Sequence, residues 1–155
     1  MNKLKYTGYV YGEGVRDKKF LMKLITLDNF QYHTSNWSFN YGSAHGCSPK
    51  VILESCKKET SGYAYDLVLC FIDLDKLKEE ANDKNKKWEK EKEKLEKEYK
   101  KIKIIWNEDC FEDEAKKVLG GDYGKHKTNK IARENVKKFI NSSYYKKILK
   151  AIQPR

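Results

Sequence analysis

The run from Tyr65 to Ile72 places the strongest constraint on the fold of this chain, because it is almost continuously apolar. A run of this length and composition favours a strand that is buried on both faces. Such strands lie at the centre of parallel sheets, where helices cover each face. The run is followed directly by Asp73-Leu74-Asp75. The sequence therefore predicts an α/β fold with two acidic residues after its central strand.

Strand and helix patterns alternate on both sides of this run. Ser48 is expected as a helix N-cap, with Pro49 as the first helical residue. The alternation predicts a mostly parallel four-stranded sheet flanked by helices, with residues 1–122 as the α/β domain and 123–155 as a basic helical extension packed on it. Further strands are expected over residues 4–11, 30–41 and 102–106, and helices from Asp17, from Pro49, over 76–103, and near 127–140 and 142–152.

Residues 76–103 are expected to form one long charged helix within the α/β domain. Its apolar residues Ala81, Trp88, Leu95 and Ile102 recur only once every seven residues. A coiled coil needs two apolar positions per heptad. We therefore expect a solvated crossover helix that adds little to the core.

The charge is concentrated near the C-terminus. The chain has 33 Lys and Arg against 23 Asp and Glu, a formal net charge of +10. Residues 123–155 contain ten basic residues and a single acidic residue, Glu134. A clustered basic surface favours binding to a polyanion such as nucleic acid. The alternative is a lysine-rich composition that serves solubility alone.

Several classes of protein are disfavoured by the sequence. No apolar run approaches the roughly 18 residues of a membrane-spanning helix, and the N-terminus lacks the apolar core of a signal peptide. The four cysteines match no common zinc spacing, and Cys70 is expected as a reduced, buried thiol. We therefore expect a cytoplasmic protein that does not associate with membranes.

Acidic residues follow two of the expected strands. Glu13 lies between Gly12 and Gly14 after the first strand, and Asp73 and Asp75 follow the buried one. Ligands bind at the carboxyl ends of the strands in open α/β sheets. If the chain is extended, Asp73 and Asp75 share one side of it. Three carboxylates at one sheet edge suit Mg²⁺ or Mn²⁺. Alternatively, the Asp-x-Asp caps the next helix and the glutamate is a turn residue.

The order of these motifs resembles the Toprim domain of topoisomerases, primases and several nucleases. Within it, the chain is most similar to the RloB-like family of bacterial defence-associated proteins, over roughly residues 6–120. The family's Thr-Glu is replaced here by Arg16-Asp17, as in maturation and repair nucleases of the same fold. The segments that carry the resemblance are Tyr11-Gly12-Glu13-Gly14 with Asp17 and Phe20, Gly46-Cys47-Ser48-Pro49-Lys50, the Asp-x-Asp strand, and Asn107-Glu108-Asp109-Cys110-Phe111-Glu112.

The resemblance implies a Rossmannoid sheet and a Mg²⁺- or Mn²⁺-dependent nuclease of a bacterial phage-defence or mobile-element system. Glu13 would act as general base or metal-anchoring acid, with Asp73 and Asp75 as metal ligands. The implied partners are DNA or RNA and a partner protein such as an ATPase. Candidates for completing a second metal site are Asp17, or the group Glu108, Asp109 and Glu112. For that group, an acidic helix N-terminus is an equal alternative.

Glycines and basic residues supply the candidates for phosphate contacts. His45 lies in a glycine-containing turn, where a plain turn residue is the alternative. Lys18, at the start of the first helix, has a solvated helix start as its alternative. The candidates for binding phosphate or nucleic acid are Gly12, Gly14, Lys18, His45, Lys125, His126, Lys127 and Lys130.

Two other functions remain open. One is a catalytically silent module that binds nucleic acid or a partner. The other is a phosphatase of the haloacid-dehalogenase type, which also uses Asp-x-Asp at a strand end. In that class the motif normally lies on the first strand, whereas Asp73 follows the third expected strand here.

Overall fold

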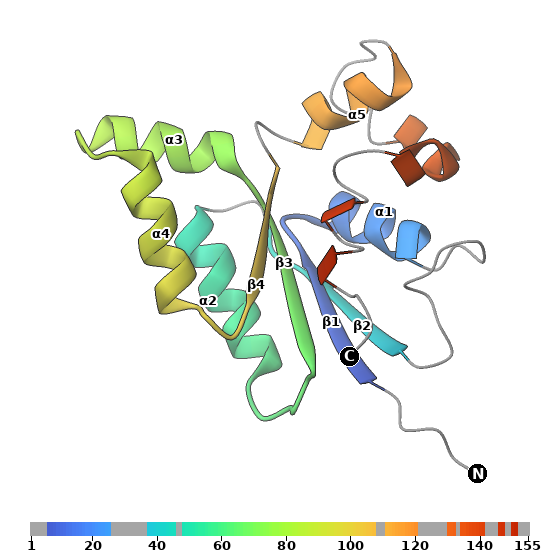
Figure 1. The fold of residues 1–155 in the computed structure, drawn as a ribbon, viewed down its shortest axis with the longest axis horizontal. Helices are drawn as coiled ribbons and strands as arrows, with labels where there is room; N and C mark the ends of the chain where they lie inside the picture. The colour runs from blue at the N-terminus through green and yellow to red at the C-terminus, as the bar shows by residue number, and fades with distance from the viewer. Residues whose placement is uncertain are drawn as a thin grey trace.

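The computed structural model of this chain describes residues 6–25, 37–45, 48–107, 111–120, 130–132, 134–141, 146–147 and 150–151. A four-stranded sheet lies at its centre, with its strands in the order β2-β1-β3-β4 and every pairing parallel (Figure 1). The predicted parallel α/β architecture is confirmed, and this topology is that of Rossmann-like folds. The strands are β1 (Tyr6–Gly12), β2 (Trp37–Ser43), β3 (Leu67–Asp73) and β4 (Lys103–Asn107).

Strand β3 is buried on both faces, as its apolar run predicts. Leu69 and Phe71 pack into one hydrophobic cluster, whereas Val68, Cys70 and Ile72 pack into a second one on the opposite face. Cys70 is a free, fully buried thiol, as expected. Successive side chains of a strand point to opposite faces. A strand with two such clusters therefore needs a helical layer on each side.

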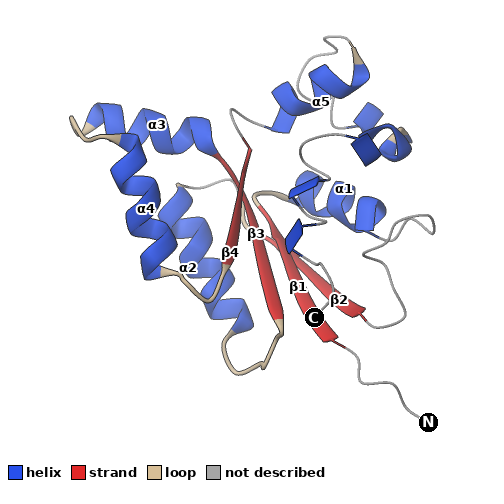
Figure 2. Ribbon diagram, viewed as in Figure 1, coloured by secondary structure: helices blue, strands red, loops and turns tan. Residues whose placement is uncertain are grey.

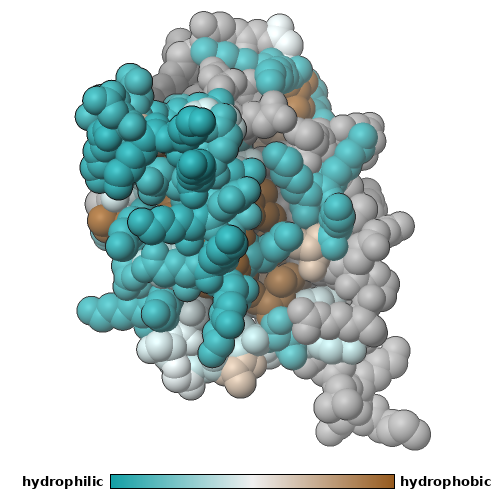
Figure 3. Space-filling view, turned by 60° about the vertical axis from the view of Figure 1, so that its left-hand side comes forward, coloured by the Kyte–Doolittle hydropathy of each residue, from teal (hydrophilic) through white to brown (hydrophobic). Residues whose placement is uncertain are grey.

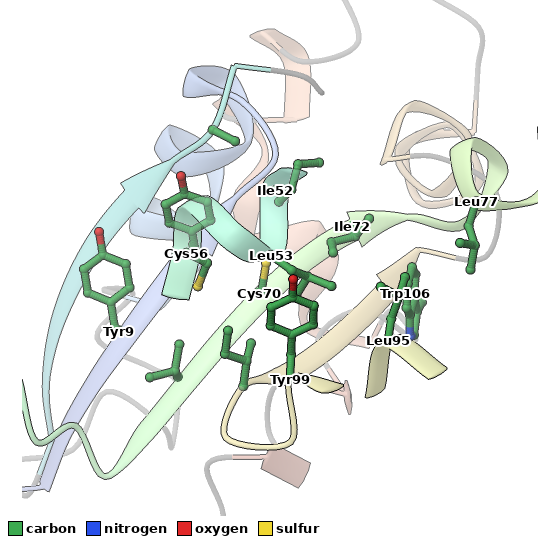
Figure 4. Close-up of a cluster of buried hydrophobic side chains, with 14 of the residues drawn as sticks. Tyr9, Ile52, Leu53, Cys56, Cys70, Ile72, Leu77, Leu95, Tyr99 and Trp106 are labelled. Carbon is green, nitrogen blue, oxygen red and sulfur yellow. The ribbon is translucent and has the colours of Figure 1, made fainter. Parts of the chain in front are cut away.

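Helices supply both layers (Figure 2). On one face, α1 packs against the sheet and against η1. The rings of Phe20 and Phe139 meet edge to face there, with their centroids 4.8 Å apart. On the other, α2 contributes Ile52 and Leu53 to a core that also contains Leu77 and Leu95 (Figure 4). The helices are α1 (Val15–Ile25), α2 (Pro49–Thr60), α3 (Leu74–Asp83), α4 (Trp88–Glu98), α5 (Phe111–Leu119) and the 3₁₀ helix η1 (Val136–Asn141).

Helix α2 begins where the sequence predicts. The Ser48 hydroxyl accepts a hydrogen bond from the Val51 N–H at 3.5 Å, and Pro49 is the first helical residue. A proline fits this position because its missing N–H would have had no partner within the helix. The predicted N-cap is confirmed.

The prediction of one long helix over residues 76–103 is wrong. The segment forms two helices, α3 and α4, joined by a turn in which Asn85 has a φ of 53°. The Lys86 N–H donates to the Ala81 carbonyl at 2.7 Å, which closes the end of α3. Asparagine tolerates this left-handed conformation better than most residues, so Asn85 ends the helix.

The expectation that this segment adds little to the core is also wrong. Leu77, Ala81, Leu95 and Tyr99 are all buried. At the turn the chain changes direction, and α4 runs from the outer end of α3 back toward the start of β4 (Figure 1), so apolar residues of both helices join the same core cluster. Leu77 and Ala81 are four residues apart, as are Leu95 and Tyr99, so each helix presents a short apolar stripe to the core that the seven-residue spacing did not predict.

In the C-terminal segment the described residues 130–132, 134, 146–147 and 150–151 are helical, Asn135 is a turn, and η1 follows it. Ala132 and Phe139 are buried in the same cluster as α1. The described part of the chain has no helix with the length and apolar character that a membrane crossing requires.

Substitution of Asn85 tests the turn between α3 and α4. We expect Asn85→Gly to raise the free energy of unfolding by roughly 0.5–1 kcal/mol, because glycine adopts positive φ without strain. Asn85→Ala should lower it by a similar amount. In a continuous helix both signs would be reversed, since alanine stabilises a helix interior and glycine destabilises it. Urea unfolding of both variants measures these changes.

Candidate metal site at the carboxyl edge of the sheet

The carboxyl ends of β1 and β3 form the point where the strand order reverses. After β1 the chain passes through α1 to β2 on one side, and after β3 it passes through α3 and α4 to β4 on the other. The two connections leave in opposite directions, and ligands of open α/β sheets bind at such a switch point. We call the strand ends at this point the crevice. Glu13 follows β1 directly, and Asp73 is the last residue of β3.

Glu13 is a buried carboxylate with two close neighbours. Its side chain is only 8% exposed, and its Oε1 lies 2.5 Å from Nζ of Lys76 in the first turn of α3. Its Oε2 accepts a hydrogen bond from the Asp73 N–H at 3.3 Å. Partial burial alone would lower the pKa of Lys76, but the hydrogen bond and charge of Glu13, followed by the charges of Asp73 and Asp75, raise that pKa overall. A buried charge needs such a partner.

Asp73 has a strongly perturbed acidity. Burial and, next, the negative charge of Glu13 raise its pKa to about 8, and the hydrogen bond from Asn107 acts in the opposite direction. That bond joins Asn107 Nδ2 to Asp73 Oδ1 at 2.7 Å. Because two like charges are costly in a partly desolvated site, Asp73 holds its proton at neutral pH. A perturbation of this kind is typical of functional sites.

Asn107 completes the cluster from the edge strand. The parallel register between β3 and β4 pairs it with Asp73. Its side-chain oxygen Oδ1 is buried and has no hydrogen-bond partner among the described residues. A buried oxygen without a partner is uncommon in folded proteins and calls for an explanation, such as a bound ion or water. The explanation we favour is a ligand of this crevice.

The residues present fit a divalent cation in their chemistry. Glu13 and Asp73 offer carboxylate oxygens and Asn107 an amide oxygen, and such hard donors suit Mg²⁺ or Mn²⁺. In the described part of the chain, no three His, Cys, Asp or Glu side chains cluster closely enough to hold a metal ion. Lys76 is the cation that now faces Glu13, so it would have to move aside for a metal.

The structure separates Asp75 from Asp73. The expectation that the two share one side of an extended chain is wrong, because α3 begins at Leu74 and Asp75 lies exposed in its first turn. Asp75 raises the pKa of Asp73, but as the weakest of its causes. An acid is favoured near a helix N-terminus. Asp73 itself occupies the N-cap position without a side-chain capping bond.

Gly12, Gly14, Lys18 and His45, the other described candidates, come from the end of β1 and from the segments that follow β1 and β2. Gly12 ends β1, and its carbonyl accepts from the Ala44 N–H at 3.0 Å. The Gly14 carbonyl accepts from the N–H of Lys18, whose side chain is half-buried. His45 is exposed just after β2.

The remaining candidates cannot be assigned to this edge. Lys130 is exposed in the C-terminal segment. Asp17 lies in the first turn of α1, but its side chain and that of Glu112 fall outside the described part. Outside the described residues altogether are Glu108, Asp109, Lys125, His126 and Lys127.

Lys76 and Asn107 contact Glu13 and Asp73 but were not among the site residues predicted from the sequence. Lys76 comes one residue after the Asp-x-Asp, so a helix that starts at Leu74 turns it back toward the strand end. Asn107 is the last residue of β4, after the apolar residues 104–106, as Asp73 is the last residue of β3. A search for polar residues at every strand end, rather than for acids alone, would have found it.

No family model, curated protein or solved structure matches this chain significantly. The assignment of the site therefore rests on its geometry: a Rossmann-like sheet with an acidic crevice at its switch point.

The pKa of Asp73 predicts how stability depends on pH in the absence of divalent cations. An unfolded aspartate titrates near pH 4 and the folded Asp73 near pH 8. Between these values the folded chain binds the extra proton, so this group makes the free energy of unfolding fall as pH rises, by at most about 1.4 kcal/mol per pH unit.

Asp73→Asn should remove this slope. Its stability relative to wild type should therefore increase steadily from pH 5 to pH 8 in urea unfolding at each pH. Asp83→Asn, a control at the exposed end of α3, should show a constant difference. If the difference in free energy of unfolding between Asp73→Asn and wild type were also constant with pH, Asp73 would not hold its proton in the folded state at neutral pH.

Proposed function

We propose that this chain is a Toprim-type nuclease, which cleaves phosphodiester bonds with Mg²⁺ or Mn²⁺ in a bacterial defence or mobile-element system. The observation that carries the proposal is the convergence of Glu13, Asp73 and Asn107 at the switch point of a parallel sheet. The oxygen atoms of these residues come from three different strand ends. This arrangement fits a ligand site better than it fits the capping of a single helix.

The residues divide the work of hydrolysis between them. A divalent cation held among Glu13, Asp73 and Asn107 would polarise the phosphate and lower the pKa of water. Glu13 accepts the proton of the water whose oxygen attacks phosphorus, while the bond from phosphorus to the leaving sugar oxygen breaks and that oxygen takes a proton from solvent. Asn107 orients the Asp73 carboxyl through its hydrogen bond. Lys76, whose side chain is 37% exposed, would contact the phosphate once it is released from Glu13.

A catalytically silent binding module is the second candidate. The 2.5 Å ion pair between Lys76 and Glu13 favours it, because the chain's own ammonium group already neutralises the carboxylate. In that case the crevice is closed by a structural ion pair and needs no metal. The two candidates differ in their response to divalent cations.

Thermal melts and cleavage assays with and without divalent cations test the nuclease. With Mn²⁺ tenfold above its dissociation constant, the wild-type melting temperature should rise by roughly 4 °C. Labelled DNA or RNA should be cleaved only in the presence of the cation. Asp73→Asn should abolish both effects while folding normally.

Asp83→Asn provides the matched control, since it also removes one aspartate charge from α3 but lies away from the crevice. It should keep both the Mn²⁺ shift and the cleavage. A wild-type melting temperature that ignores millimolar Mg²⁺ and Mn²⁺ would eliminate the metal site and leave the binding module.

Replacement of Lys76 tests its competition with the cation. Lys76→Gln removes the ammonium group that now pairs with Glu13, so we expect Mn²⁺ to bind more tightly, by about tenfold or more, in calorimetric titration at pH 8. Cleavage by the same variant should be slower if Lys76 contacts the phosphate. Lys84→Gln, at the exposed end of α3, should match wild type in both measurements. Weaker Mn²⁺ binding by Lys76→Gln would contradict the competition.

A further inference from the structure

A groove lined by lysines follows the open edge of β4. Within the described residues β4 pairs only with β3, and its other edge borders a cavity of about 750 Å³. Its apolar lining includes Leu67, Ile104 and Trp106, and Glu96 is the one acidic residue of the described lining. Its lysines come from α4, the α4–β4 turn, β4 and the C-terminal segment: Lys92, Lys100, Lys103, Lys147 and Lys150. We call this cavity the lysine groove.

Two of its lysines have partners within the protein. Lys92 Nζ lies 3.8 Å from a carboxylate oxygen of Glu96, and Lys147 Nζ donates to the Trp106 carbonyl at 3.0 Å. Lys100, Lys103 and Lys150 are exposed around the same cavity. Like charges gathered around one cleft repel one another and create a positive field that attracts anions. The positive field of the lysine groove therefore favours binding of a polyanion.

Protection of the open edge of β4 from pairing with another strand explains only part of this arrangement of lysines. One lysine on an edge strand is enough to discourage pairing with another strand, and Lys103 supplies it. The other four lysines come from segments outside the strand. Lys147 also occupies the Trp106 carbonyl, which an added peptide strand would need as a hydrogen-bond acceptor. A peptide strand is thus a poor occupant.

The lysine groove ends at Trp106, one strand residue before the acidic cluster. Trp106 lines the groove, and Asn107, the next residue, donates to Asp73. From Lys103 to Asn107 the strand spans roughly 13 Å. Figure 3 turns this side of the molecule forward and shows hydrophobic residues in a hollow between hydrophilic ones. A chain that lies along the groove would therefore bring its phosphates to the crevice.

We infer that the lysine groove binds a single strand of DNA or RNA, with its phosphates against the lysines and its bases on the apolar floor. A single strand fits this mixed lining because its bases are exposed, whereas a duplex hides them. This inference deepens the proposed function, on which it rests, by naming the form of the substrate and the surface that holds it.

Binding in EDTA tests the lysine groove separately from catalysis. The full chain is titrated into fluorescein-labelled 12-nucleotide single strands of DNA and RNA and into a 12-base-pair duplex, by anisotropy at several salt concentrations. The triple variant Lys100→Gln, Lys103→Gln, Lys150→Gln should bind single strands at least about tenfold more weakly. The slope of log affinity against log salt should flatten by about 2, at about 0.7 for each lost phosphate contact.

A matched control removes the same charge outside the groove. Lys94→Gln, Lys101→Gln, Lys146→Gln changes three exposed lysines that come from α4, the turn before β4 and the C-terminal segment. This variant should keep the wild-type slope and affinity within about twofold. Melting curves of both variants verify that they fold.

Three results would overturn the inference: no binding of single strands by the wild type, tighter binding of the duplex, or equal losses in the two triple variants. Failure of the proposed function is distinguishable from these. If the groove variant loses binding in EDTA but the wild type never cleaves with Mg²⁺ or Mn²⁺, the groove stands and the nuclease does not. If the wild type cleaves and the groove variant has an unchanged KM, the groove assignment fails alone.

Discussion

The burial of β3 on both faces is the constraint from which the other features follow. Its side chains alternate between two hydrophobic clusters, so the sheet must carry helices on each side. Parallel neighbours then require helical crossovers, and the crossovers after β1 and β3 leave in opposite directions. The crevice between these two strand ends is a consequence of the same topology. The packing of one strand therefore also decides where Glu13 and Asp73 meet.

The charges at the crevice are balanced by an ion pair and by a proton retained on Asp73. Glu13 remains buried because Lys76 lies 2.5 Å away, and Asp73 avoids a second negative charge by holding its proton. Asn107 fixes one Asp73 oxygen yet leaves its own oxygen without a partner among the described residues. The charges of such a site are compensated by the protein itself, but it retains oxygen donors of the kind that a divalent cation binds. The same arrangement therefore supports both a latent metal site and a closed ion pair.

The hairpin of α3 and α4 links the crevice to the surface of the molecule. Helix α3 starts directly after Asp73 and positions Lys76, and the turn at Asn85 returns the chain so that α4 lies beside β4. Leu95 and Tyr99 anchor this return in the core. Because α4 is otherwise rich in lysine and glutamate, its anchoring places charged side chains along the edge strand. One wall of the lysine groove is thus a product of the turn.

The sequence by itself determined the parallel α/β architecture, the start of α2 at Ser48-Pro49, and the acidic residues Glu13 and Asp73 at two strand ends. These features are local: a continuous apolar run, a capping pair and residues that follow a strand can each be recognised within a few positions. Only the tertiary structure decided that Asp75 turns away, that Lys76 pairs with Glu13, and that Asn107 meets Asp73. The heptad spacing of residues 76–103 likewise gave no sign of the turn at Asn85, because the core decides whether a charged helix continues or folds back. Contacts between distant residues depend on strand order and register, which no single segment of the sequence encodes.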